Sequence, residues 1–184
     1  SLPDEEALIT RPIPADDPPA DDYVASGPPA ARTPIGPVDL AEIDRAAVQE
    51  VDYSPGLFRA RLECVACPRV MEAGRWYRPD VELRNDSPVA WPLPEMGSPD
   101  VRITYHWLTV EGDLYDNKGR RTVLPHMLRP GETTSLPAPV RSPEEPGDYI
   151  RQWDLIVPNV ARFSERGWRG PEIWVSVVPK AFEP

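Results

Sequence analysis

Two stretches of the chain alternate apolar and polar side chains, and this period of two restricts the fold more than any other feature. In residues 101–107 the apolar side chains stand at the odd positions, and in 149–157 the odd positions are again mostly apolar. A strand points successive side chains to opposite faces of its sheet, so this period is typical of a strand with one buried face. Trp107 and Trp153 are therefore predicted to lie in the core. His106, at an even position, is predicted to face solvent or a partner strand.

Shorter runs of the same kind, separated by Gly, Pro, Asn and Asp, fill the rest of residues 57–178. Residues 85–88 (Asn-Asp-Ser-Pro) are predicted to turn the chain, and residues 117–119 (Asn-Lys-Gly) to close a hairpin. Many short strands at roughly 8–12-residue spacing are typical of an antiparallel β-sandwich. The fold class is therefore all-β, with strands predicted at 57–62, 77–83, 101–107, 114–116, 121–124, 133–136, 149–157 and 173–178.

The net charge of −10 is concentrated near the N-terminus. Residues 1–52 hold 12 acidic and 3 basic side chains, whereas 53–184 hold 18 acidic and 17 basic ones. The first segment is also rich in proline, which removes backbone donors, and its carboxylates repel one another. We therefore expect an extended, Pro-rich acidic tail over 1–52 and a β-sandwich domain over 53–184. Within the tail, Asp39 and Glu42 could cap a short helix over 39–51, or this stretch continues the linker.

Several classes of function are disfavoured by composition. The predicted domain has no surplus of Lys and Arg, so no nucleic-acid partner is expected, because neutralising phosphates requires clustered basic residues. The sequence contains no run of about 18 apolar residues, so no membrane insertion is expected. It shows neither a nucleophile elbow nor a paired-carboxylate motif. We expect neither catalysis nor a cofactor.

Residues 146–149 (Pro-Gly-Asp-Tyr) open the second alternating stretch. They resemble the tyrosine corner of immunoglobulin-like sandwiches, in which a tyrosine at the start of a late strand bonds back to the backbone. This motif predicts an immunoglobulin-like antiparallel β-sandwich and assigns Tyr149 a structural role.

Cys64 and Cys67 form a C-x-x-C pair with three interpretations. A metal site needs about four ligands, and the chain offers only these cysteines with His106 and His126, which lie in different predicted elements. A redox dithiol of the thioredoxin type needs a βαβ context, yet this pair ends a strand and precedes Pro68. The simplest interpretation is a strand-end pair, either as free thiols or as a local disulfide, and we expect no metal.

The aromatic side chains in turns are the best candidates for a ligand site. Sugars pack their C–H faces on aromatic rings, while carboxylate, amide and guanidinium groups hold the hydroxyls. Trp91, Tyr115 and Trp168 lie in predicted turns or loops. The alternative is that Trp168 folds inward over the end of the sandwich and Tyr115 packs across its hairpin. The candidate ligand-binding residues are Tyr115, Asp116, Asn117, Arg121, Trp168 and Arg169.

Five parts of the sequence together resemble a known family. The first is residues 83–85 followed by Trp91 and Pro92, and the others are residues 105–108, 119–125, 129–132 and 145–149. They resemble the β-sandwich accessory modules of bacterial glycosyltransferases and methyltransferases in surface-polysaccharide pathways. Those modules are similar to the carbohydrate-binding domain at the C-terminus of O-antigen ABC-transporter ATPases. The resemblance covers residues 58–178, and its motifs are mainly scaffold turns and core rings.

This resemblance implies a non-catalytic module that binds a saccharide or polysaccharide, attached to a partner enzyme domain. The alternative is a protein-interaction or structural module that docks or positions a partner enzyme through a sheet edge or an apolar face. Two features depart from the family pattern, the Cys64 and Cys67 pair and the insertion at 168–171.

Overall fold

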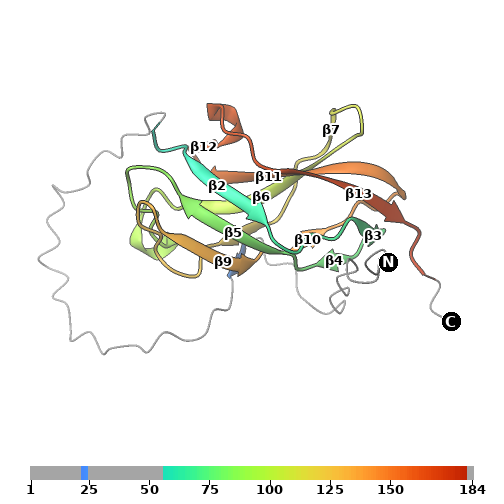
Figure 1. Ribbon diagram of the computed structural model, residues 1–184, viewed down its shortest axis with the longest axis horizontal. Helices are drawn as coiled ribbons and strands as arrows, with labels where there is room; N and C mark the ends of the chain where they lie inside the picture. The colour runs from blue at the N-terminus through green and yellow to red at the C-terminus, as the bar shows by residue number, and fades with distance from the viewer. Residues whose placement is uncertain (1–21, 25–55, 182–184) are drawn as a thin grey trace, which may run out of the picture.

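The computed structural model describes residues 22–24 and 56–181, and it confirms the predicted all-β sandwich (Figure 1). A small sheet and a large sheet face each other and bury the core between them. Residues 39–51, for which a short helix and a continuing linker were both open, lie outside the described residues. In the described part of the chain, no helix is long and apolar enough to cross a membrane.

The small sheet contains three antiparallel strands, in the order β2 (Ala60–Cys64), β5 (Asp80–Asn85) and β9 (Thr133–Pro137). The central strand β5 alternates exposed and buried side chains along its whole length, with Val81 and Leu83 buried. This is the pattern of a strand with one face on a core. The first strand begins three residues later than predicted, while Leu57 and Phe58 are buried ahead of it.

The large sheet is antiparallel except at its two edges, where the pairs β1–β8 and β13–β3 are parallel. Its order is β1 (Asp22–Val24), β8 (Arg121–Val123), β6 (Arg102–Leu108), β11 (Gly147–Val157), β13 (Glu172–Val178) and β3 (Val70–Glu72), with β7 (Leu114–Asp116) on β6 and β12 (Ala161–Arg162) on β11. A separate two-stranded ribbon and two 3-10 turns complete the described elements: β4 (Trp76–Tyr77), β10 (Val140–Arg141), η4 (Pro94–Met96) and η5 (Ser164–Arg166).

The core confirms the two tryptophans predicted to be buried. Trp107 and Trp153 are almost completely inaccessible, and Tyr105 packs edge-on against both rings. Trp91 was predicted to lie in a loop, with its ring either exposed or capping one end of the sandwich, and the structure buries it completely. Its backbone bridges to Leu128, and its ring packs against Phe163, so this loop belongs to the core.

The predicted hairpin at 117–119 is wrong. β7 and β8 do not pair with each other, because both pair with β6 at successive positions along the same edge. Asp116 lies opposite Trp107, whereas Thr122 lies opposite Ile103. Residues 117–120 therefore pass beside the middle of β6 without a ladder of their own, and this detour creates space beside the sandwich.

The tyrosine corner is confirmed. Tyr149 stands at the start of β11, and its hydroxyl donates to the carbonyl of Glu145 at 3.0 Å. The turn predicted at 85–88 is present as well, organised by the buried Asn85 amide. That amide donates to the carbonyls of Val89 and Leu128 and accepts from the backbone and hydroxyl of Ser87. These are local polar groups satisfying backbone atoms that would otherwise be buried without partners.

Strand β1 is the described part of the acidic N-terminal segment. It pairs in parallel with β8, with Asp22 opposite Arg121 and Val24 opposite Val123. A three-residue strand at a sheet edge fixes few residues and contributes little to stability. Deleting residues 1–37 is therefore expected to lower the melting temperature by less than about 4 °C in a thermal denaturation experiment. A decrease of about 10 °C or more would place this segment in the folding unit.

Candidate functional site

A cleft of about 960 Å³ opens at the side of the sandwich, where residues 117–120 pass beside β6. One wall comes from β7, the following segment and the start of β8, and the other comes from β4, β10 and the residues after β10. The lining residues are Trp76, Tyr105, Trp107, Tyr115, Asp116, Asn117, Lys118, Gly119, Arg120, Arg121, Arg141, Ser142, Pro143, Glu144 and Arg162.

The floor of the cleft is fixed by hydrogen bonds between β6 and β10. The indole N–H of Trp107 donates to the carbonyl of Arg141 at 2.9 Å, and the backbone N–H of Arg141 donates to the hydroxyl of Tyr105 at 2.9 Å. Burial raises the pKa of the Tyr105 hydroxyl, so this floor is neutral at ordinary pH. A floor held by buried aromatic side chains keeps the two walls at a set separation.

Two aromatic rings are accessible from the cleft. Tyr115 is 40% exposed and packs edge-on against Tyr149, with the ring centroids 4.8 Å apart. Burial, together with the neighbouring Tyr115 hydroxyl, raises the pKa of Tyr149 to about 12. On the opposite wall Trp76 is half-buried, and the guanidinium of Arg120 lies 5.3 Å from its ring centroid. Of the two rings, Tyr115 is therefore the exposed one, whereas a guanidinium lies over the ring of Trp76.

The polar lining is mainly cationic. Lys118, Arg120, Arg121, Arg141 and Arg162 face two carboxylates, Asp116 and Glu144. Arg141 pairs with Glu144 at 2.5 Å, and an Asp116 carboxylate oxygen accepts the backbone N–H of Lys118 at 2.9 Å. Because residues 53–184 are nearly neutral as a whole, the cleft carries a positive charge that the rest of the domain does not share. This positive charge favours the binding of an anion in the cleft.

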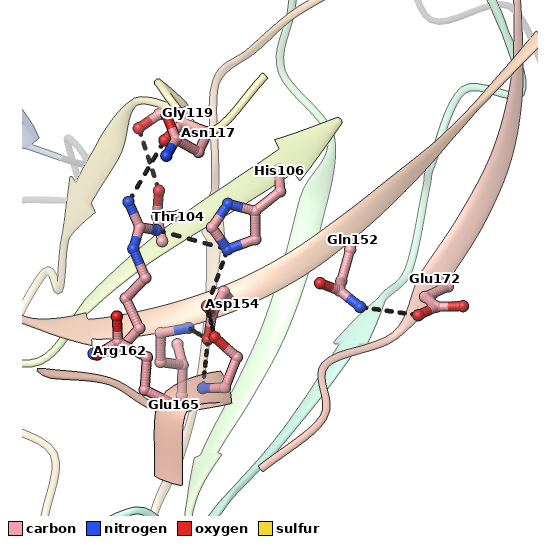
Figure 2. Close-up of polar contacts among 11 residues, drawn as sticks. Thr104, His106, Asn117, Gly119, Gln152, Asp154, Arg162, Glu165 and Glu172 are labelled. Atoms are coloured by element: carbon pink, nitrogen blue, oxygen red, sulfur yellow. Dashed lines mark hydrogen bonds and ion pairs between the residues drawn. The ribbon is translucent and has the colours of Figure 1, made fainter. Parts of the chain in front are cut away.

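Arg162 lines the cleft and lies between His106 and the segment 117–120, as the labelled side chains in Figure 2 show. Its guanidinium donates to the carbonyl of Asn117 at 3.3 Å, and the hydroxyl of Thr104 donates to the carbonyl of Gly119 at 3.1 Å. These bonds attach the segment 117–120 to β12 and β6 through carbonyl groups, which leaves the Asn117 side chain at the cleft surface.

His106 is buried, so of its two predicted orientations the one toward solvent is wrong and the one toward a partner strand holds, because Asp154 lies on β11 beside β6. Its Nε2 donates to a carboxylate oxygen of Asp154 at 2.9 Å, and the Arg162 guanidinium lies 3.5 Å from the same nitrogen (Figure 2). The sequence pattern could not show this burial, because it results from tertiary packing. β6 is a central strand, and Arg162, which follows β11 in the chain, covers His106 on its outer face. Asp154 also accepts the backbone N–H groups of Leu155 and Ser164.

The carboxylate of Asp154 stands between His106 and the hydroxyl of Ser164, which donates to it at 2.5 Å. In the Ser-His-Asp arrangement of hydrolases, the hydroxyl instead contacts the imidazole, which takes its proton. Here both groups bind the same carboxylate, an arrangement that fixes the segment after β12 on the sheet.

Gly119 makes the close approach of this segment to β6 possible. A Cβ at this position would overlap the carbonyl oxygen of Tyr105. The approach is of backbone to backbone, so no side-chain rotation relieves the overlap. Glycine in such a place marks a requirement for space.

Four of the six predicted site residues come together. Tyr115, Asp116, Asn117 and Arg121 all line the cleft. Trp168 and Arg169 do not, and the expectation of an available ring at position 168 is corrected. Trp168 packs against the core, its indole N–H donating to the carbonyl of Ala60 at 2.8 Å and its ring contacting Phe163. The inward-folding alternative holds for this residue.

The opposite wall was missed by sequence reasoning. Trp76 and Arg141 are paired across β4 and β10, two-residue strands too short to produce a readable period. Arg162 lies on another two-residue strand. The sequence around Trp76 and Arg141 carries no period or motif that indicates a site.

Cys64 and Cys67 form a disulfide, with their Cα atoms 5.6 Å apart. This agrees with the interpretation of the pair as a local strand-end unit, one form of which was a disulfide. Within residues 22–24 and 56–181, no group of three or more His, Cys, Asp or Glu side chains is placed to hold a metal ion.

Residues 69–178 match the protein family described as the Ig-like domain from next to BRCA1 gene. No curated protein has a significant match to this chain. The match confirms the coarser part of the resemblance noted above, an immunoglobulin-like β-sandwich.

Several solved structures align with this chain at low identity and with TM-scores below 0.5. The CARDB domain of PF1109 from Pyrococcus furiosus is 19% identical, with a TM-score of 0.38, over 66% of this chain and 94% of that one. The sporulation control protein Spo0M from Bacillus subtilis is 10% identical, with a TM-score of 0.40, over 64% of this chain and 49% of that one. The ASH/PapD-like domain of human CEP192 is 14% identical, with a TM-score of 0.31, over 69% and 90%. At this level of likeness they carry no argument about function.

The family match spans most of the two sheets, from the residue before β3 to the last residue of β13, and covers more than half of the 184 residues. The chain therefore belongs to the family of Ig-like domains from next to BRCA1 gene.

Proposed function

We propose that this domain is a non-catalytic binding module whose cleft takes a negatively charged saccharide unit of a surface polysaccharide. The observation that carries the proposal is the cleft itself, in which the exposed ring of Tyr115 lies beside Asp116, Asn117 and Arg121. A ring to pack on a sugar face and convergent polar groups to hold its hydroxyls are the requirements of a saccharide site.

The charge of the cleft narrows the class of sugar. Five cationic side chains and two carboxylates line it, so a uronic acid or another acidic sugar fits better than a neutral one. Arginine can hold a carboxylate with two parallel hydrogen bonds, which adds direction to the attraction. In a polysaccharide pathway such a module would bring the polymer to an attached glycosyltransferase or methyltransferase domain.

The test is calorimetric titration of the domain with tetragalacturonate, and with maltotetraose as a neutral oligosaccharide of the same length. We expect the acidic ligand to bind at least about tenfold more tightly, a difference of about 1.4 kcal/mol, and this preference to weaken at high salt. Replacing Tyr115 by alanine is expected to reduce affinity about five- to tenfold, since an aromatic contact contributes about 0.5–1.5 kcal/mol beyond its area.

Leu114→Ala is the matched control. Leu114 is the neighbouring exposed residue on β7, at 59%, and does not line the cleft. It should bind like the wild type. A wild-type domain that binds neither oligosaccharide, or a Leu114→Ala variant as weak as Tyr115→Ala, would contradict the proposal.

A second candidate function, docking of a partner protein, is favoured by the pairing of β1 with β8. An edge strand that accepts one extended segment can accept another in the same place, with backbone hydrogen bonds supplying affinity. A segment of acidic character would suit Arg121, which opens β8 and lines the cleft. A labelled peptide of residues 16–28 added to the domain lacking 1–37 tests whether this edge accepts a strand; no binding would remove this candidate.

A further inference from the structure

Arg151 is an arginine placed in the interior of the sandwich. It stands in the middle of β11, where its side chain is 0% exposed. Its guanidinium carbon lies 5.2 Å from the ring centroid of Trp153 and 5.9 Å from that of Trp107. The two rings cover the planar guanidinium and exclude water from it. They stabilise the cation through their π faces without neutralising it.

The polar contacts of this guanidinium are with sulfur atoms. Nη2 donates to Sγ of Cys67 at 2.8 Å, Nη1 lies 4.0 Å from Sδ of Met71, and Nε is buried without a partner. Among the described residues, no carboxylate forms an ion pair with Arg151. Burial lowers the pKa of Arg151 to about 10, which leaves the side chain protonated at neutral pH.

An uncompensated buried cation is unfavourable, and a neighbouring anion would offset part of its cost. Two titratable groups face the guanidinium, Tyr105 from β6 and Cys67 from the segment between β2 and β3. Burial raises the pKa of Tyr105, so its hydroxyl stays neutral. Cys67 is neutral in the disulfide, but reduction would give it a thiol that can ionise in contact with Arg151. Thiolates are stabilised by neighbouring arginine in this way.

We propose that Cys64 and Cys67 form a thiol–disulfide exchange site in which Arg151 holds the reduced Cys67 as a thiolate. The substrates are low-molecular-weight thiols and their disulfides. This proposal is independent of the saccharide cleft, because neither cysteine lines it. The segment between the cysteines is open to solvent, with Val65 69% exposed, and both cysteines are half-buried, so a small thiol can approach.

The exchange proceeds in two balanced steps. An incoming thiolate attacks Sγ of Cys64, the disulfide bond breaks, and the electron pair leaves on Sγ of Cys67, next to Arg151. The better-stabilised thiolate is the better leaving group, which selects Cys64 as the atom attacked. A second thiolate then attacks the external sulfur of the mixed disulfide, releasing Cys64 and forming the external disulfide. Two electrons have passed from the two external thiols to the protein. Cys64 takes up one proton, and the other is released to solvent because Cys67 stays a thiolate beside Arg151.

The first experiment compares the two cysteines singly. Cys64→Ser leaves Cys67 as the one thiol, and Cys67→Ser leaves Cys64. The rate of alkylation by iodoacetamide is measured against pH for each folded variant, with tryptophan fluorescence as the check of folding. We expect Cys67 to titrate at least about one unit below the usual value of about 8.5, and Cys64 close to that value. A Cys67 midpoint equal to or above that of Cys64 overturns the proposal.

The second experiment removes the cation. In the Cys64→Ser background, Arg151→Met should raise the midpoint of Cys67 by about one unit or more, whereas Arg151→Lys, which retains a cation, should raise it less. With both cysteines present, a smaller fraction of the Cys64–Cys67 disulfide should be reduced in Arg151→Met than in the wild type at a fixed ratio of reduced to oxidised glutathione. The equilibrium constant for its reduction should fall about tenfold for each unit by which the pKa of Cys67 rises. A folded Arg151→Met variant with an unchanged midpoint also overturns the proposal. Should that variant fail to fold, the comparison of the single-cysteine variants decides.

Discussion

Replacing Trp153 by alanine is expected to lower the free energy of unfolding by about 3–5 kcal/mol, the range for truncating a large buried aromatic side chain. Trp153 is 1% exposed, lies opposite Tyr105 across β6 and β11, and covers the Arg151 guanidinium. The substitution removes ring contacts that hold the two central strands and opens a cavity that close-packed neighbours cannot fill. Chemical denaturation monitored by circular dichroism measures the change.

Trp174→Ala is the control for this substitution. Trp174 is on β13 of the same sheet but is 55% exposed, so its truncation should change stability by no more than about 0.5–1 kcal/mol. Similar losses for the two variants would mean that Trp153 is not distinguished by its burial, and the assignment of the core would be wrong. Trp153 does not line the cleft, so its effect on any ligand should follow stability alone.

Gly119→Ala is expected to have the second largest effect, a loss of about 2–3 kcal/mol in stability. The added methyl group would overlap the carbonyl oxygen of Tyr105, so the segment 117–120 must move away from β6. That movement breaks the bond from Thr104 to the Gly119 carbonyl and displaces one wall of the cleft. Binding should therefore weaken even under conditions where the variant remains folded, as titration of the folded protein can show.

Lys118→Ala is the control that tests whether the loss of stability is specific to Gly119 or follows from any substitution in residues 117–120. Lys118 is the exposed neighbour, and removing its side chain should leave stability within about 0.5 kcal/mol of the wild type. If Gly119→Ala is equally harmless, residues 117–120 can move freely from β6, and the close approach is not required for folding.

The two strands with long stretches of alternating apolar and polar side chains were predictable from the residues alone. In β6 and β11 the odd positions are buried, with Trp107 and Trp153 in the core, because burial of one sheet face requires an apolar side chain at every second position. The tyrosine corner was predictable for a similar reason: Tyr149 and its acceptor are only four residues apart. Both signals are local, so tertiary context does not alter them.

One wall of the cleft was also within reach of the sequence, since Tyr115, Asp116, Asn117 and Arg121 are close in the chain and share a turn-like segment. The other wall was not. Trp76 and Arg141 are brought together by pairing of β4 with β10, and the floor bonds attach that ribbon to β6. Strands of two residues leave no period to read, and their partners are set by how the whole sandwich closes.

The sequence by itself determined the all-β class, the positions of the long strands, the tyrosine corner and half of the candidate site. Only the tertiary structure decided the inward packing of three other side chains: His106 against Asp154, Trp168 against Phe163, and Arg151 against Cys67. The physical reason is that alternation identifies the two faces of a strand but not what covers the second one. Burial of that face depends on segments distant in sequence, whose contacts form only when the two sheets pack together.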